Sequence, residues 1–367
     1  MIEKSLFILL LTGFGEELVS VKTFHDYIDI LEPDDIRWRE FIEHNEKATI
    51  FHHPAWIRFI SDCYHHYPFI ICVLDPNGNI HAGAPMVEVN SLLSGHRWVS
   101  LPFTDHCSPL YDDPHWLVYL IDYFLETIGK RSVPKIELRW EYPIVPDSYK
   151  TEQYVLSRLE LCPQSELIAK RIDHKYRRMP RIAQERGAYC RQGMSLDDMH
   201  IFYRLHTMTR HRLGVPVQPI KFFEFLWKYL VEPGMGFFMH VYKDNVCLSS
   251  ALFLHWNHTL IYKYSASSGL ERQISPNDLL IWKAIQWGCE HGFTELDMGR
   301  TNKDQDGLRH FKRRWGSQES PLIYTIFSDT LPNELNGEMM KALNTAIRHS
   351  PTWVCRVTGE ILYGHFG

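Results

Sequence analysis

The sequence predicts an α/β (α+β) protein with two similar domains, each a mixed β-sheet flanked by helices. Its 367 residues are enough for two domains of ordinary size, each with its own core. A content of 45% hydrophobic and 13% aromatic residues is typical of a globular chain. The order helix, hairpin, strand, helix, strand occurs once in each half, and this doubling predicts two related domains.

The first copy of this order begins with a helix over residues 54–65. Pro54 stands in its first turn, and Trp56, Phe59 and Ile60 follow at helical spacing. The sequence Asp-Pro-Asn-Gly-Asn at 75–79 predicts the hairpin turn. The other elements expected in this copy are strands at 69–74, 80–90, 97–101, 135–140 and 154–161, and a helix that Pro114 opens and Gly129 ends.

The second copy begins with a helix over residues 222–230. A tight turn at 243–245 joins the two strands of its hairpin, and Pro276 opens its long helix. Residues 294–296 then occupy the place that 136–140 occupy in the first copy. The elements expected here are strands at 237–242, 246–255, 259–265 and 294–297, and helices at 222–230 and 276–292.

The domain limits follow from this repeat. Residues 5–15 have about the length of a signal-peptide core, but Glu16 and Glu17 follow where small residues would mark cleavage. A buried strand, or a start site placed too early, therefore explains them better than a leader. The predicted parts are an uncertain N-terminal extension at 1–18, a first domain at 19–165, a second domain at 166–335 and a C-terminal helical tail at 336–367.

Composition excludes several classes of function. A net charge of −5 argues against DNA and against any polyanion bound over the whole chain, so basic surface must be local. Eight scattered cysteines without a CxxC pair argue against zinc or a disulfide scaffold and fit a reducing cytoplasm. Adjacent histidines such as His52 and His53 diverge, so we expect no metal site. No apolar run reaches the roughly 20 residues that span a bilayer.

Residues 170–191 form the most basic region of the chain. Eight lysines and arginines stand here against Asp173 and Glu185. A solvated helix face accounts for part of this charge, but the excess favours a phosphate-bearing partner such as a nucleotide sugar, a lipid pyrophosphate or transfer RNA. The next helix adds Arg210 and Arg212.

The stretch 295–316, ELDMGRTNKDQDGLRHFKRRWG, is where we expect the chemistry. A strand at 294–297 should end where Gly299 turns the chain, and a helix should begin near Gln305. On that helix the residues Leu308, Phe311 and Trp315 predict an apolar stripe facing a core. Lys312 would lie beside the stripe and lose hydration, although an ordinary solvated basic face has the same spacing.

The run Gly307-Leu308-x-x-Phe311-Lys312-x-x-Trp315-Gly316 resembles the closing motif of the FemABX-type aminoacyl transferases. With Asp297-Met298-Gly299-Arg300 upstream, it is also similar to the FemAB-related proteins encoded beside exopolysaccharide and exosortase loci. The likeness covers roughly residues 160–330. It implies two tandem GNAT-like (acyl-CoA N-acyltransferase-like) domains and a lysine at the reaction centre, here Lys312.

The resemblance also suggests roles for other residues. Lys312 would stabilise a developing oxyanion or assist proton transfer, and Asp297 would position it or the acceptor. Tyr262 and Tyr264 either line the substrate cleft or pack on one face of an alternating strand. Residues expected to hold phosphate, carboxylate or the acceptor are Arg300, Arg309, Arg210 and Arg212.

One loop outside this motif carries possible acid–base chemistry. Asp105 and His106 lie in the polar segment 101–109, which is rich in turn residues. They could act as acid–base partners, but a capping or turn role is the more ordinary interpretation of such a segment.

The expected function is transfer of an acyl or aminoacyl group to an amine or hydroxyl of a nucleotide- or lipid-linked cell-envelope glycan precursor, of peptidoglycan or exopolysaccharide. We expect a cytoplasmic location, with peripheral contact at the inner face of the membrane. The alternatives are an acyl-CoA-dependent N- or O-acyltransferase acting on polysaccharide, and a non-catalytic GNAT-like scaffold in polysaccharide assembly.

We expect no tightly bound cofactor, and a donor that is either aminoacyl-tRNA or acyl-CoA. The loop 271–278 lacks the glycines of the usual coenzyme A cradle, and Pro276 and Asp278 deny a pyrophosphate a free amide and a positive helix end. This favours aminoacyl-tRNA. The long helical arm of some FemABX relatives has no counterpart here, which limits what the resemblance implies about transfer RNA.

Overall fold

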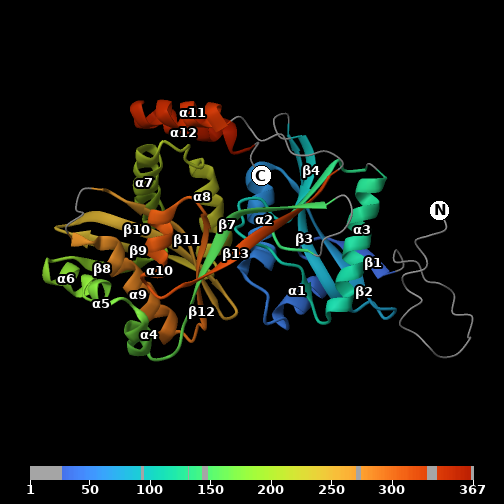
Figure 1. Ribbon diagram of the computed structural model, residues 1–367, viewed down its shortest axis with the longest axis horizontal. Helices are drawn as coiled ribbons and strands as arrows, with labels where there is room; N and C mark the ends of the chain where they lie inside the picture. The colour runs from blue at the N-terminus through green and yellow to red at the C-terminus, as the bar shows by residue number, and fades with distance from the viewer. Residues whose placement is uncertain are drawn as a thin grey trace, which may run out of the picture.

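The computed structural model describes residues 27–91, 95–130, 132–142, 148–269, 274–328 and 337–364. The predicted extension at 1–18 therefore lies outside the described residues. One continuous twisted sheet crosses the molecule, with helices on both of its faces (Figure 1). None of the helices in the described ranges has the length and apolar character needed to cross a bilayer.

The first half contains every element that its sequence predicts, with small shifts at the ends. Its elements are β1 (Ile28–Leu31), α1 (Ile36–Glu43), η3 (Ile50–His52), α2 (Pro54–Tyr64), β2 (Tyr67–Leu74), β3 (Ile80–Ser91), β4 (Gly95–Val99), β5 (Leu110–Tyr111), η4 (Pro114–Trp116), α3 (Leu117–Gly129), β6 (Lys135–Leu138) and β7 (Ser148–Glu160).

The second half repeats the central part of this order. Its elements are α4 (Ser165–Arg171), α5 (His174–Arg177), α6 (Met179–Glu185), β8 (Tyr189–Gly193), α7 (Leu196–Leu213), α8 (Ile220–Leu226), η5 (Trp227–Val231), β9 (Gly236–Lys243), β10 (Val246–Trp256), β11 (Thr259–Ser267), α9 (Pro276–Glu290), β12 (Glu295–Asn302), α10 (Asp306–Arg313), β13 (Gln318–Ser328), α11 (Gly337–His349) and α12 (Thr352–Leu362). The last two form the helical tail.

The sheet topology confirms the internal repeat. The strand order is β1-β2-β3-β4-β6-β13-β7-β12-β11-β10-β9-β8, with β5 beside β3. In each half a meander of antiparallel strands leads into a parallel pair, β4 with β6 and β11 with β12. A crossover helix, α3 or α9, joins the two strands of each parallel pair, as parallel pairing requires.

The last strand of each half pairs across the centre of the molecule. β7 follows β6 in the chain but lies against β12, and β13 follows β12 but lies against β6. β7 and β13 also pair with each other along nine residue pairs. The boundary at 165 thus follows a strand that sits among strands of the second half, and the proposed limits 19–165 and 166–335 remain a prediction.

Three large cores fill the space between sheet and helices. α3 covers one face of the first half and α9 covers one face of the second. The third core is shared, because α2 of the first half meets α8 of the second, with the rings of Phe59 and Phe222 4.8 Å apart. α11 and α12 lie over α7 on this side (Figure 1). The shared core and the paired strands together join the two halves.

The structure corrects two expectations for residues 295–316. β12 does not end at Gly299; it continues to Asn302, and Gly299 takes a φ of +75° at a bulge in the strand. α10 begins at Asp306, with Gln305 as an N-cap that makes no side-chain hydrogen bond. The apolar stripe is only partly right: Phe311 packs against the core under α9 and Trp315 is fully buried, but Leu308 is 42% exposed, whereas Lys312 is 3% exposed.

We expect Trp315→Ala to lower the free energy of unfolding by about 3–5 kcal/mol, because it removes a fully buried indole from the core under α9. Leu308→Ala, on the same segment but exposed, should change it by less than about 0.5 kcal/mol. Urea unfolding of both variants measures the difference. Equal losses for the two would show that the side of α10 facing the core has been misassigned.

Candidate functional site

β11 and β12 separate at the centre of the second half, and polar side chains fill the gap. The strands are paired only from Thr259 with Glu295 to Ile261 with Asp297. Beyond these pairs each strand has a bulge, at Lys263 in β11 and near Gly299 in β12. A bulge turns the following side chains and opens the ladder, which is why such irregularities often lie beside functional sites.

Lys312 points from α10 into this gap. Its Nζ donates hydrogen bonds to the carbonyl oxygens of Gly299, at 2.7 Å, and of Arg300, at 3.2 Å. Burial lowers the pKa of its ammonium group to about 8, although the charges of Asp105 and Asp297 oppose that shift. Lys312 thus loses hydration as predicted, and its part in catalysis stays a prediction.

Asp297 is buried and ionised beside Lys312. Its Oδ2 lies 2.7 Å from Nε2 of His106, and its Oδ1 accepts the backbone N–H of Gly299 at 2.7 Å. Burial opposes ionisation, but the hydrogen bond and charge of His106 hold the pKa of this carboxyl below its usual value. One short segment, 297–300, therefore contacts both Lys312 and His106.

The loop 101–109 of the first half delivers Asp105 and His106 to the same place. Leu101 and Phe103 have φ values of +64° and +59°, which are costly for residues with a Cβ and cluster at functional sites. The capping or turn role expected for this loop therefore does not account for Asp105 and His106, because both side chains face the centre of the molecule.

Asp105 gathers a second set of charges. Its carboxylate lies 3.4 Å from Nζ of Lys263 and 3.5 Å from Nε of Arg300. Arg300 donates a hydrogen bond to the hydroxyl of Tyr324, which in turn donates to the carbonyl oxygen of Asp105. Burial lowers the pKa of Lys263, and these two cations hold the pKa of Asp105 down despite its burial. Arg300 thus lies at the site, and its part in binding phosphate or carboxylate stays a prediction.

Sequence reasoning missed Lys263 and Tyr324. The available signal was a lysine in the middle of an otherwise uncharged strand, 259–267, where a buried charge needs a partner. Tyr324 lies on β13, a strand absent from the prediction. Its partners, Asp105 and Arg300, come from opposite halves of the chain, so no local pattern indicates the contact.

Tyr262 and Tyr264 lie on opposite faces of the sheet. The bulge at Lys263 inserts one extra residue between them, so Tyr262 packs on Phe253 under α9, while Tyr264 packs on Phe223 between α7 and α8. The expectation that they share one face of an alternating strand is therefore wrong. Their role toward a substrate stays a prediction.

The other predicted binding arginines are engaged within the protein. Arg309 forms an ion pair with the carboxylate of Glu319, in which Nη2 donates a hydrogen bond to Oε2 at 2.8 Å. Arg210 donates to the hydroxyl of Tyr363 on the tail, and Arg212 donates to Ser267 at the end of β11. Their contacts hold elements together, so their part in binding phosphate or acceptor remains a prediction.

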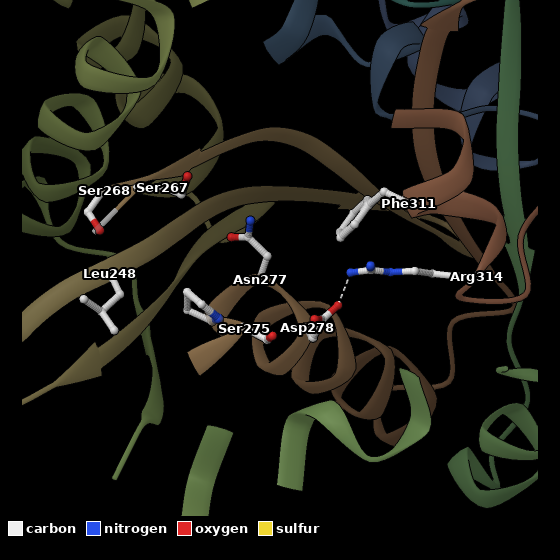
Figure 2. Close-up of a pocket in the computed structure, with 10 residues that line it drawn as sticks. Leu248, Ser267, Ser268, Ser275, Asn277, Asp278, Phe311 and Arg314 are labelled. Carbon is white, nitrogen blue, oxygen red and sulfur yellow. Dashed lines mark hydrogen bonds and ion pairs between the residues drawn. The ribbon is translucent and has the colours of Figure 1, made fainter. Parts of the chain in front are cut away.

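A pocket of about 280 Å³ lies at the end of β11 opposite to the parallel pairs (Figure 2). Phe311 and Arg314, on either side of Lys312 in the sequence, form one wall, and the first turn of α9 forms another. Arg314 pairs with Asp278 across it. This pair offsets the negative charge that Asp278 places on the first turn of α9. Ser275 is the N-cap of α9, but its side chain makes no cap hydrogen bond, and residues 271–273 lie outside the described residues.

The basic region 170–191 is exposed and touches the same pocket wall. Lys170, Lys175 and Arg178 lie at the surface of α4 to α6. Tyr176 from this region stacks on the guanidinium of Arg314 at 4.3 Å. A positively charged surface therefore adjoins α10. In the parts of the chain described, no group of three or more His, Cys, Asp or Glu side chains could hold a metal ion.

Comparison with known sequences supports the resemblance that the motif predicted. The acetyltransferase (GNAT) domain family matches residues 170–313, less than half of the chain. Lipid II:glycine glycyltransferases are 35% identical over 86 residues in Staphylococcus epidermidis and 34% identical over 86 residues in Staphylococcus aureus. The match covers 22% of this chain and only about a fifth of the length of those relatives.

Comparison with solved structures extends the likeness to nearly the whole fold. A crystal structure of FemX superposes with a TM-score of 0.63 at 15% identity, over 86% of this chain and 100% of that chain. The C-terminal domain of a putative lysylphosphatidylglycerol synthetase from Agrobacterium fabrum gives a TM-score of 0.53 at 11% identity, over 84% and 94%. The chain thus has the tandem GNAT-like fold, and its similarity to FemABX-type transferases is confirmed.

The wild-type protein should gain stability relative to Lys312→Met as the pH rises from about 8 to 10.5. Below pH 8 Lys312 is charged in both the folded and the unfolded chain. The free-energy cost of burying this charge then destabilises the folded chain in full. Between these pH values the unfolded chain keeps a proton that the folded one has lost, so rising pH favours folding by about 3 kcal/mol in total. Urea unfolding of both proteins across this range measures the difference, and parallel stability curves would contradict the depressed pKa.

Proposed function

We propose that this protein transfers an acyl or aminoacyl group from an activated carrier to an amine or hydroxyl of a cell-envelope glycan precursor. The observation that carries the proposal is the buried cation of Lys312, held at the bulge of β12 by the carbonyl oxygens of Gly299 and Arg300. The relatives that share sequence similarity are named lipid II:glycine glycyltransferases, a name that describes aminoacyl transfer. Their similarity supports the same reaction class here.

The geometry of Lys312 suits an oxyanion. When a nucleophile adds to an ester or thioester carbonyl, negative charge develops on the carbonyl oxygen, and a preorganised donor in a dry site lowers the barrier. An ammonium group has three N–H donors. Two of those on Lys312 are engaged by Gly299 and Arg300, and we propose that the third meets the reacting oxygen. Asp297 and Asp105 keep the surroundings negative enough to favour the charged form.

The acceptor we propose is lipid-linked. The relatives named above act on lipid II, and an acceptor of that kind would bring the protein to the cytoplasmic face of a membrane. Trp353, Val357 and Ile361 are exposed on one face of α12 and are apolar side chains suited to such a surface. A polysaccharide acceptor, as in exopolysaccharide systems, is the alternative, and sedimentation with anionic lipid vesicles separates the two.

The donor we propose is aminoacyl-tRNA. The pocket beside Phe311 contains a neutral ion pair, Asp278 with Arg314, and Pro276 removes an amide from the helix end that would bind a pyrophosphate. A large polyanionic carrier would instead find the exposed positive surface of α4 to α6 next to that pocket. Acyl-CoA remains the alternative donor.

Lys312→Ala should lower kcat by about 10²- to 10³-fold, as expected for the loss of one oxyanion donor, while a cooperative thermal melt shows that the variant still folds. Lys303→Ala, an exposed lysine close by in sequence, is the control and should keep full activity. Turnover is measured with aminoacyl-tRNA or acyl-CoA as donor and a lipid-linked muropeptide as acceptor. A wild-type protein that supports polymer assembly but transfers nothing with either donor would indicate the scaffold alternative.

Replacing Lys170, Lys175 and Arg178 together by glutamine should weaken binding of transfer RNA and flatten the slope of log K against log salt by about 2 to 3. The matched control replaces Lys130, Lys221 and Lys228, which are exposed elsewhere, and should leave the slope unchanged. Acetyl-CoA should show no micromolar binding by calorimetry. Micromolar acetyl-CoA binding, with no effect of the basic triple variant on RNA, would make acyl-CoA the donor.

A further inference from the structure

Lys263 is a buried lysine to which the proposed reaction assigns no part. Among the lysines in the described ranges, only Lys263 and Lys312 are buried, and the charge of Asp105 acts on both of them. Burying an ammonium group costs free energy, and an apolar side chain of similar length would fill the same space at a lower cost. A role at the site therefore explains Lys263 better than packing does.

The bulge in β11 directs Lys263 into the core that the two halves share. Its Nζ lies 5.5 Å from the ring centre of Tyr264, the next residue along the bulged strand. The rings of Phe51 and Trp56, from the first half, lie 5.1 and 5.3 Å from the same atom. Aromatic faces attract an ammonium group, so these three rings favour the charged form although burial lowers the pKa of Lys263.

Lys263 stabilises the least favourable part of the loop 101–109. Phe103 has a φ of +59°, and this left-handed conformation is costly for a residue with a Cβ. The Nζ of Lys263 donates a hydrogen bond to the carbonyl oxygen of Phe103 at 3.0 Å, and it lies 3.4 Å from Oδ2 of Asp105. One ammonium group therefore binds both the backbone of the loop and its acidic side chain.

The carboxylate that Lys263 binds lies against Gly299. A Cβ on Gly299 would stand 3.0 Å from Oδ2 of Asp105, so the carboxylate is in close contact with the backbone there. The carbonyl oxygen of Gly299 accepts the hydrogen bond of Lys312 Nζ at 2.7 Å. The charge of Asp105 favours the ammonium form of Lys312 and opposes the effect of burial. The position of Asp105 thus connects the two buried lysines.

We propose that Lys263 is a positioning residue, which holds the carboxylate of Asp105 at Gly299 and thereby keeps Lys312 charged for the transfer reaction. The inference rests on the proposed function and deepens it, because it explains how a lysine that binds an oxyanion keeps its proton in a dry site. The other titratable and charged groups that act on these three side chains are Arg300, Asp297, His106 and Glu319.

The pKa of Lys312 tests the inference without donor, acceptor or turnover. Its ¹³Cε resonance is followed against pH in protein labelled with ¹³Cε-lysine, and it is assigned by its absence from Lys312→Met. In Lys263→Met, Lys312 should titrate about one pH unit lower than in the wild type, because the favouring carboxylate is no longer held nearby. The loss of a cation by itself has the opposite sign, since it raises the pKa of a neighbouring ammonium group.

A double-mutant cycle shows whether Lys263 acts through Asp105. Asp105→Asn should also lower the pKa of Lys312, and Lys263→Met should lower it no further in that background. Lys263→Arg keeps a charge and N–H donors, so it should retain most of the wild-type value, and it provides a second variant should the methionine variant not fold. Lys150→Met is the control and should leave the pKa of Lys312 unchanged, because Lys150 pairs with Glu141 at 2.6 Å near the start of β7.

The kinetics should agree with the titration. Lys263→Met should lower kcat with little change in KM, and it should move the basic limb of the kcat profile to lower pH. An unchanged or higher pKa of Lys312 in Lys263→Met, or the same effect of that substitution with and without the carboxylate of Asp105, would overturn the inference. The expected pKa changes in a protein that transfers nothing would instead refute only the proposed reaction.

Discussion

The exchange of β7 and β13 is the constraint on which the rest of the structure depends. Each strand ends one half of the chain and pairs within the other, and together they form the middle of a single sheet. Their ladder holds the two halves at a fixed separation and twist. The core shared by α2 and α8 then closes one side of the junction. Only with both contacts in place do the loop of the first half and β12 of the second half meet.

The candidate site uses that junction directly. His106 and Asp105 come from the first half, whereas Asp297, Arg300 and Lys312 come from the second. Neither half alone carries all of these side chains. Placing so many charges away from water is unfavourable unless each finds a partner, and here the partners come from the opposite half. The bulges in β11 and β12 make the space, because a regular ladder would leave no gap between the strands.

The sequence was sufficient for what local rules determine. Proline at helix starts and the alternation of short strands predicted most elements, and the repeated order predicted the two related halves. It failed where a long-range contact overrides a local pattern. The spacing of residues on α10 predicted that Leu308 is buried in the core. β12 lies so close to this helix that Lys312 is buried instead, and its ammonium group donates hydrogen bonds to backbone carbonyl oxygens. The bulge at Lys263 likewise separates two tyrosines that strict alternation puts together.

The exchanged strands also bear on how the chain can fold as it is made. When residue 165 has left the ribosome, β6 still has a bare edge, since β13 is synthesised more than 150 residues later. β7 also lacks both of its neighbouring strands until β12 and β13 have been synthesised. The nascent first half therefore carries an unpaired, partly apolar edge for most of synthesis, a hazard for mispairing between chains. The complete sheet, and with it the candidate site, can form only after β13 has been synthesised.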